Sequence, residues 1–172
     1  MRVSNPLARL RMGGVFAALL LMISNVATAD GSRQTATPII PDAQWQKIYE
    51  DYGFSPALLI GDTVHVSGII VRLKGEGTYE ERYAAGLRGT FAFLERLIEP
   101  TGATLDDIIE MTSFHTDIAK QLPTILSVRK SLMNKPHPAW TAVGTTGLAD
   151  PNGQTEIKFL IKLKPRATNV GR

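Results

Sequence analysis

The strongest hydrophobic pattern in the chain predicts an amphipathic helix that begins near Thr78. Its hydrophobic side chains recur three or four positions apart and therefore share one face: Tyr83, Leu87, Phe91, Leu94 and Ile98. Thr78 and Glu81 match a capping box in the first turn of this helix. Pro100 and Gly102 follow the last hydrophobic position and end the helix.

Shorter apolar segments predict a second helix and a set of strands. The second helix spans about 119–133, with Pro123 in its first turn, where a missing N–H group is tolerated. Strands are predicted from β-branched or alternating segments at 44–49, 63–67, 108–116, 140–145 and 155–163, and a short apolar run lies at 57–60. The order ββ-α-β-α-ββ indicates a single α+β domain, with two helices on one face of a mixed sheet.

The first 29 residues have the pattern of an export signal. Basic residues precede an apolar run over 13–23, which is too short to cross a bilayer as a stable anchor. Ala27 and Ala29 provide the small side chains that signal peptidase requires. We therefore predict a signal peptide over 1–29, export to a periplasm and no membrane association after cleavage. An uncleaved anchor is the alternative.

The remainder of the chain divides into a leader, one domain and a tail. Residues 30–44 are polar with two prolines, which predicts a flexible leader before a domain over 45–165. Residues 166–172 form a short C-terminal tail. The sequence has no Cys, so the core and oligomerisation must stabilise the exported protein without disulfides.

The net charge of +3 belongs to the N-terminal segment. Three of the 19 Lys and Arg residues precede Asp30, whereas all 16 Asp and Glu residues lie from Asp30 onward. The mature chain therefore has no net charge. Nucleic-acid binding usually needs a basic surface to neutralise phosphates, so we expect no nucleic-acid partner.

Common catalytic motifs do not occur in this sequence. His115 and Asp117 share a predicted strand face, but two ligands do not complete a metal site. His65 and Ser67 also share a face, without the G-x-S-x-G elbow of a hydrolase. No phosphate-binding or dinucleotide fingerprint is found, and we predict neither a metal nor a cofactor.

Glu156 is the acidic residue of greatest interest, because it lies inside the last predicted strand. Its neighbours Thr155 and Ile157 point to the opposite face of that strand. The carboxylate is therefore either exposed on one face of the sheet or held in a cleft. The residue pattern alone favours exposure.

Several motifs resemble those of the RidA/YjgF family. They occur in the family's order: FSPA at 54–57, GDTV at 61–64, VSG at 66–68, GATLDDI at 102–108, HTD at 115–117 and PAWTAVG at 138–144. Glu156 and Ile157 resemble the end of its C-terminal signature. The resemblance covers about residues 46–164, which is most of the mature chain.

This resemblance implies a chorismate-mutase-like α+β fold and a homotrimer that binds a small molecule in clefts between subunits. Family members hydrolyse enamines and imines such as 2-aminoacrylate to a 2-keto acid and ammonia. By resemblance, Glu156 positions or activates water. The backbone at Ser67, Gly68 and Ala142 faces the ligand.

Three positions depart from the family pattern. Trp140 replaces an arginine that binds the substrate carboxylate, Phe54 lacks the hydroxyl that an aromatic residue there can offer, and Leu126 replaces an asparagine. A Trp offers one N–H donor and a π face in place of a bidentate guanidinium. We therefore expect a more apolar pocket and a neutral, cyclic or aromatic imine. Packing at a subunit interface is the alternative role for Trp140.

Two functions remain open at this point. The first is an exported imine or enamine deaminase that uses Glu156. The second is a non-catalytic, small-ligand-binding or chaperone-like trimer on the same fold. RNA cleavage, a third activity known in relatives, is disfavoured by the neutral mature chain.

Overall fold

The computed structural model describes residues 34–165, so the predicted signal peptide and the 166–172 tail lie outside the described residues. The described part contains these helices and strands: β1 (Thr37–Ile39), α1 (Ala43–Tyr52), β2 (Ala57–Ile60), β3 (Thr63–Val71), α2 (Tyr79–Ile98), β4 (Ile108–His115), α3 (Ile118–Leu132), β5 (Ala139–Gly144) and β6 (Thr155–Lys162). Two short 3₁₀ helices, Glu99–Thr101 and Leu105–Asp107, connect α2 to β4. No helix within 34–165 is long and apolar enough to span a membrane.

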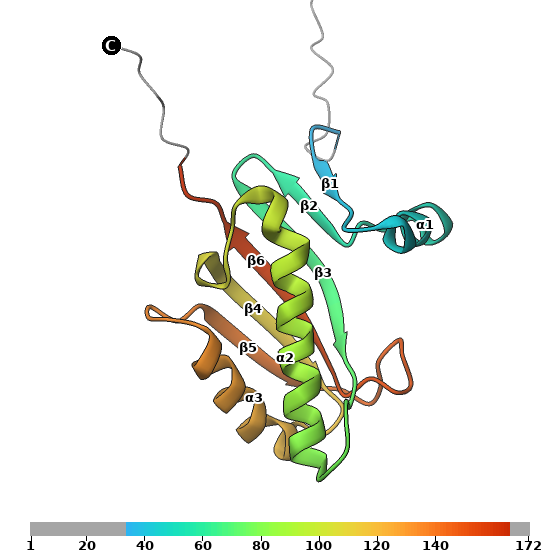
Figure 1. The fold of residues 1–172 in the computed structure, drawn as a ribbon, viewed down its shortest axis with the longest axis vertical. Helices are drawn as coiled ribbons and strands as arrows, with labels where there is room; N and C mark the ends of the chain where they lie inside the picture. The colour runs from blue at the N-terminus through green and yellow to red at the C-terminus, as the bar shows by residue number, and fades with distance from the viewer. Residues whose placement is uncertain (1–33, 166–172) are drawn as a thin grey trace, which may run out of the picture.

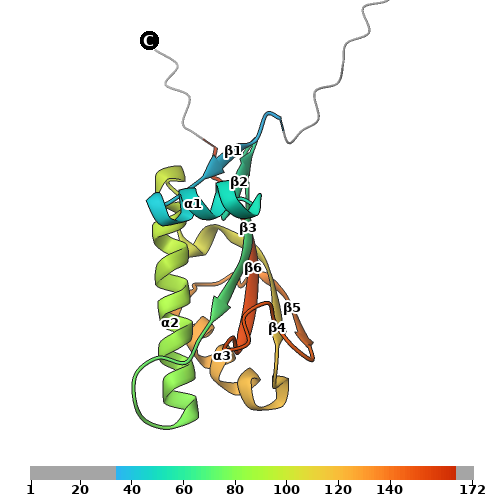
Figure 2. The ribbon, with the colours of Figure 1, turned by 90° about the vertical axis from the view of Figure 1, so that its right-hand side faces the viewer.

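The strands form one mixed sheet in the order β1-β2-β3-β6-β4-β5. Only the β4–β5 pair is parallel, and α3 makes the crossover between these two strands. Helices α2 and α3 lie over the same face of the sheet (Figure 1), and the edge-on view shows the other face without helices (Figure 2). The predicted α+β class and the mixed sheet are confirmed.

The core lies between α2 and the sheet. The predicted apolar face of α2 is buried, with Tyr83, Leu87 and Leu94 fully inaccessible to solvent. Strand β6 alternates between buried residues that face the helices and more accessible residues on the opposite side, which we call the open face. Glu156 and Lys158 are on the open face, so the alternation fixes the direction in which the candidate carboxylate points.

The strand predicted at 44–49 is wrong, because this segment lies in α1. Asp42 caps the helix by accepting a hydrogen bond from the Trp45 amide at 3.0 Å, and Gly53 ends it with φ of 68°. Trp45 stacks on Phe93 of α2, with ring centroids 5.5 Å apart. The domain therefore has three α-helices, where the sequence pattern predicted two.

Two further boundaries differ from the predictions. The 37–39 segment of the expected leader forms β1, which pairs antiparallel with β2 and so belongs to the sheet. Strand β3 continues to Val71, beyond the expected end at 67, because it resumes pairing with β6 after an irregularity.

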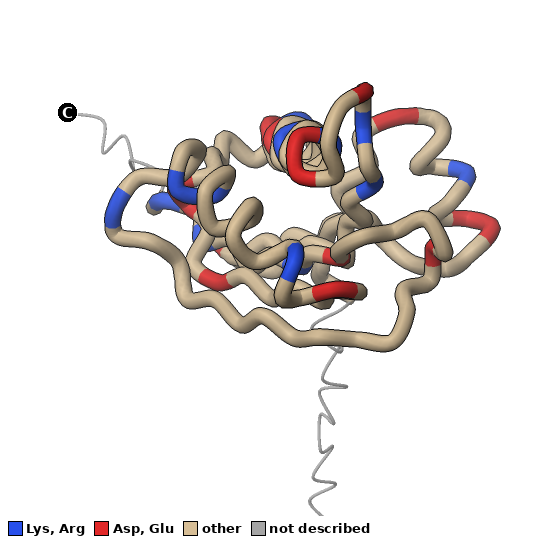
Figure 3. The backbone as a smooth tube through the Cα atoms, turned by 90° about the horizontal axis from the view of Figure 1, so that it is seen from below, with Lys and Arg blue, Asp and Glu red and all other residues tan. Residues whose placement is uncertain are grey.

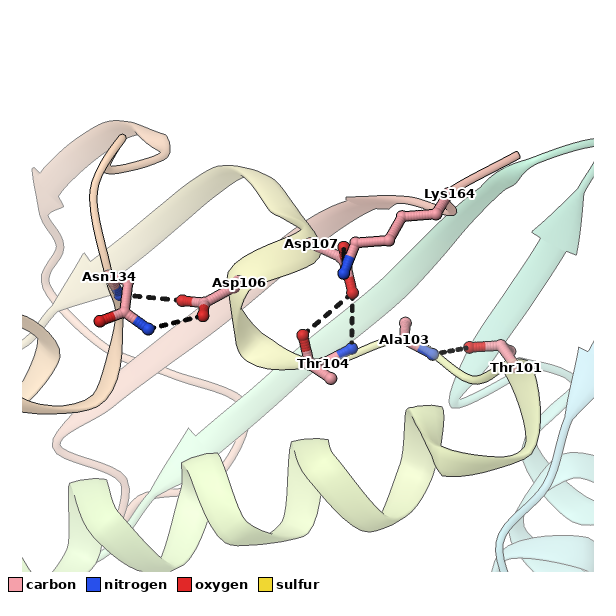
Figure 4. Close-up of polar contacts among 7 residues, drawn as sticks. All are labelled: Thr101, Ala103, Thr104, Asp106, Asp107, Asn134 and Lys164. Atoms are coloured by element: carbon pink, nitrogen blue, oxygen red, sulfur yellow. Dashed lines mark hydrogen bonds and ion pairs between the residues drawn. The ribbon is translucent and has the colours of Figure 1, made fainter. Parts of the chain in front are cut away.

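The GATLDDI motif holds the start of β4 in place (Figure 4). Asp107 accepts hydrogen bonds from the amide and hydroxyl of Thr104 at 2.9 and 3.0 Å, and pairs with Lys164 at 3.2 Å. Asp106 accepts from the backbone and side-chain amides of Asn134, which follows α3, at 2.8 and 2.7 Å. These carboxylates have structural roles.

Candidate functional site

A β-bulge in β3 forms the first part of the candidate site. The register of β3 against β6 shifts between Val66 and Ile69, so Ser67 and Gly68 together lie opposite one residue of β6. The Ser67 amide donates to the Pro56 carbonyl at 2.9 Å, and its hydroxyl donates to the Ser55 carbonyl at 2.7 Å. The bulge is thus attached to the segment that precedes β2.

Glu156 lies directly against this bulge. A Cβ atom at Gly68 would lie 1.7 Å from Glu156 Oε1 and 2.5 Å from Glu156 Cδ, so any other residue here would displace the carboxylate from its position. Glu156 is partly buried. Its exposure is therefore intermediate between the two alternatives of the sequence, a carboxylate exposed on the sheet and one held in a cleft. Nothing else in the described residues forms a hydrogen bond or an ion pair with its carboxylate.

A hollow of about 440 Å³ on the open face lies next to the bulge. Its polar lining comes from β3, β4, β6 and the loop before β2: Ser55, His65, Ser67, Glu110, Thr112 and Lys158. Glu156 is not among the lining residues. Phe54 comes directly before the lining residue Ser55 in the sequence and is 43% exposed. Its ring contacts Trp45 edge to face, with the ring centroids 6.5 Å apart.

Trp140 and Ala142 lie on the opposite side of the sheet from Glu156. They are in register with Met111 and Ser113 of β4, which are buried beneath the helices. Glu156 is in register with Phe114, the residue between Ser113 and His115. Because adjacent strand residues point to opposite faces, one chain cannot bring Trp140 and Glu156 to the same ligand.

The Trp140 side chain is held by two contacts. Its indole N–H donates to Ser113 Oγ at 2.9 Å, and the guanidinium carbon of Arg129 in α3 lies 4.7 Å from the ring centroid. Arg129 was missed in the sequence analysis, because no local pattern shows which α3 residue crosses to β5. Leu126, one turn earlier on α3, is 42% exposed.

His115 belongs to a buried hydrogen-bond network. Its Nε2 lies 2.8 Å from Ser113 Oγ and its Nδ1 lies 3.1 Å from Gln121 Oε1. Burial lowers the pKa of His115, and the Gln121 hydrogen bond only partly opposes that effect, so the neutral imidazole is favoured. The network continues through Gln121 to Tyr79 at 3.1 Å.

The structure also separates the pair considered as metal ligands. Asp117 caps α3 by accepting from the Lys120 amide at 3.2 Å, whereas His115 is fully buried. Within residues 34–165, no group of three or more His, Asp or Glu side chains is arranged to hold a metal ion.

The sequence matches a known protein family over most of the described residues. A family model described as Endoribonuclease L-PSP matches residues 46–162. The RutC family protein YjgH of Escherichia coli K12 is 37% identical over 128 residues, which cover 74% of this chain and 95% of that protein. The chain belongs to the YjgF/RidA family.

Solved structures agree with this family assignment. The structure of protein YJGH has a TM-score of 0.60 and 32% identity, and the match covers 76% of this chain and 98% of that one. Rv2704 of Mycobacterium tuberculosis, a YjgF/YER057c/UK114 family member, shares the fold with a TM-score of 0.58 and 23% identity, over 74% and 99% of the two chains. In this YjgF/RidA member, the VSG motif forms the bulge and the PAWTAVG motif forms β5.

Proposed function

We propose that this protein hydrolyses reactive imines or enamines to a carbonyl compound and ammonia, with Glu156 as the catalytic residue. The observation that carries the proposal is the Glu156 carboxylate against the Gly68 backbone, without a partner in the described residues. A carboxylate held in this way is available to a ligand.

The reaction needs one group that accepts and then donates a proton. Glu156 takes a proton from water as the water oxygen bonds to the C=N carbon, and it then protonates the nitrogen. The resulting carbinolamine loses ammonia and becomes the carbonyl product. An enamine first tautomerises to the same imine: its terminal carbon gains a proton and its nitrogen loses one.

We further propose a homotrimer with its ligand sites between subunits. Glu156 and Trp140 face opposite sides of one sheet, so they can meet only if the neighbouring chain contributes one of them. Within residues 34–165 the open face carries no helix (Figure 2), which leaves it available for packing against another copy. Closed cyclic symmetry would give each subunit the same interface.

The substrate's charge depends on what surrounds Trp140. The expectation of a neutral, cyclic or aromatic substrate assumed that no cation remains near position 140. Arg129 lies over one face of the Trp140 ring, and the indole N–H already donates to Ser113. That face and that donor are therefore not free for a cationic or aromatic ligand.

RNA cleavage is not the function we propose, although the matching family model carries an endoribonuclease name. Basic and acidic positions are interspersed along the backbone of residues 34–165 (Figure 3). A phosphate backbone would meet carboxylates as well as cations on such a surface.

The test is ammonia release from 2-aminoacrylate and from a panel of carboxylated and neutral imines. Glu156→Gln should lower turnover at least about 100-fold, because an amide cannot transfer the proton. Glu76→Gln, an exposed loop carboxylate, is the matched control and should leave turnover unchanged. Ligand binding without turnover of any imine by the wild type would refute the proposal and favour the non-catalytic alternative.

A further inference from the structure

Arg129 is a partly buried cation without an anionic partner in the described residues. It extends from α3 over Trp140 at the edge of the sheet. Its Nε atom is buried and makes no hydrogen bond, and no ion pair within 34–165 includes this side chain. Burying a charged donor in this state is unfavourable, so the position is suited to an anion that binds there.

The surroundings of Arg129 support the same conclusion. Burial lowers the pKa of Arg129, and no neighbouring carboxylate opposes that effect. Trp140 holds the guanidinium through a cation–π contact. A guanidinium held over a ring keeps its N–H donors in its own plane, where a carboxylate can accept two of them.

The adjacent strand edge offers a further donor. Strand β5 ends the sheet and pairs only with β4, so its second edge is open in the described chain. The Thr145 amide donates inward to the His115 carbonyl at 2.8 Å. Because backbone amides alternate in direction along a strand, the amide of Ala142 points to the open edge, two residues beyond Trp140.

We propose that Arg129, held over Trp140, binds the carboxylate of the substrate, with the Ala142 amide as a second donor. The preferred substrates are then 2-imino and 2-enamino acids, not neutral imines. Arg129 supplies from α3 the positive charge that position 140 lacks. The substrate class rests on the proposed function, whereas carboxylate binding by Arg129 can be tested without any turnover.

The direct test is calorimetric titration of the full mature chain with pyruvate and with acetone, which lacks the carboxylate. Pyruvate is the product of 2-aminoacrylate hydrolysis. The wild type should bind pyruvate in clear preference to acetone. Arg129→Gln should weaken pyruvate binding about 10- to 100-fold, the range expected for a lost charge-assisted hydrogen-bonded pair. Arg129→Lys should fall in between, because it keeps the charge without the planar donors.

Lys130→Gln is the matched control, since it removes the same charge from the next, exposed position of α3. It should leave pyruvate binding unchanged. Equal weakening by Lys130→Gln and Arg129→Gln, or unchanged binding in Arg129→Gln, would overturn the inference. If Arg129→Gln does not fold, the Arg129→Lys variant carries the comparison, and wild-type affinity in it would count against the proposed planar contact.

Turnover separates this inference from the proposed function. Arg129→Gln should lower kcat/KM for carboxylated imines much more than kcat/KM for neutral imines. If the wild type and Arg129→Gln both turn over imines with the same substrate preference, the role of Arg129 is refuted and the proposed hydrolysis stands. Pyruvate binding that depends on Arg129, without hydrolysis of any imine, would overturn the proposed function alone.

Discussion

Gly68→Ala tests the role of Glu156 without changing a charged group. The new Cβ atom would lie 1.7 Å from Glu156 Oε1 and 2.7 Å from Glu156 Cγ, far inside van der Waals contact. The backbone of Gly68 is not in the left-handed region, so alanine is compatible with its conformation. The substitution therefore acts through displacement of the carboxylate.

The expected magnitudes follow from this geometry. The three atoms nearest to the methyl group all belong to the flexible Glu156 side chain, which can move away at a cost of about 0.5–1.5 kcal/mol. The free energy of unfolding should fall by no more than this. The carboxylate, in contrast, must move by more than about 1 Å, a displacement that typically lowers catalysis about 100-fold.

The assay measures ammonia release and urea unfolding for the wild type and for Gly68→Ala. Gly147→Ala is the control, because a Cβ atom there meets nothing within 4 Å. In a Glu156→Ala background, Gly68→Ala should no longer affect stability, because the Glu156 carboxylate that the new methyl group meets is absent. A folded Gly68→Ala protein with wild-type turnover would refute the reasoning.

Two further predictions concern stability and processing. Burial would raise the pKa of Asp107, but the Thr104 hydrogen bonds and Lys164 outweigh it and leave the pKa below the ordinary 3.8. Asp107→Asn should therefore lower the free energy of unfolding by about 1–3 kcal/mol at pH 7. Urea titrations should show this difference shrinking below about pH 4, as the wild-type carboxylate protonates; an equal difference at pH 3 would contradict it. Intact mass of the exported protein should correspond to a chain that begins at Asp30, and a mass that retains residues 1–29 would contradict the predicted cleavage.

The sequence predicts the elements whose pattern is long or strictly periodic. The apolar face of α2 repeats from Tyr83 to Ile98 and its capping box is local, so both are confirmed in the structure. The segment 44–49 is too short for its period to be decided, and its helix depends on the Asp42 cap and on the stacking of Trp45 on Phe93. That stacking joins residues 48 positions apart, which a local pattern cannot predict.

The candidate site also combines residues that the sequence identifies with contacts that only the structure shows. Ser67, Gly68 and Glu156 were selected by resemblance, and the bulge that places Gly68 against Glu156 is visible only in the register of β3 and β6. Trp140 was recognised as a departure from the family pattern. Its partner Arg129 was not, because the α3–β5 contact is tertiary and no motif includes it.

The placement of Glu156 and Arg129 leads to a last prediction about how subunits share a site. Glu156 is on the open face, whereas Arg129 and Trp140 lie on the helix-covered side of the same sheet. If both groups act on one substrate, they must come from neighbouring chains of the proposed trimer. Light scattering should first confirm that the mature protein is a trimer, and a stable monomer would remove the shared site.

Trimers assembled from a mixture of Glu156→Gln and Arg129→Gln subunits then provide the decisive assay. Each parent protein should be nearly inactive toward a carboxylated imine. In a random mixture of equal amounts, a site formed between neighbours receives both native groups in about one quarter of cases. The mixture should therefore recover about one quarter of wild-type turnover after subunit exchange. If it recovers none although exchange is shown by mass spectrometry, Glu156 and Arg129 do not complete one another's site across the interface.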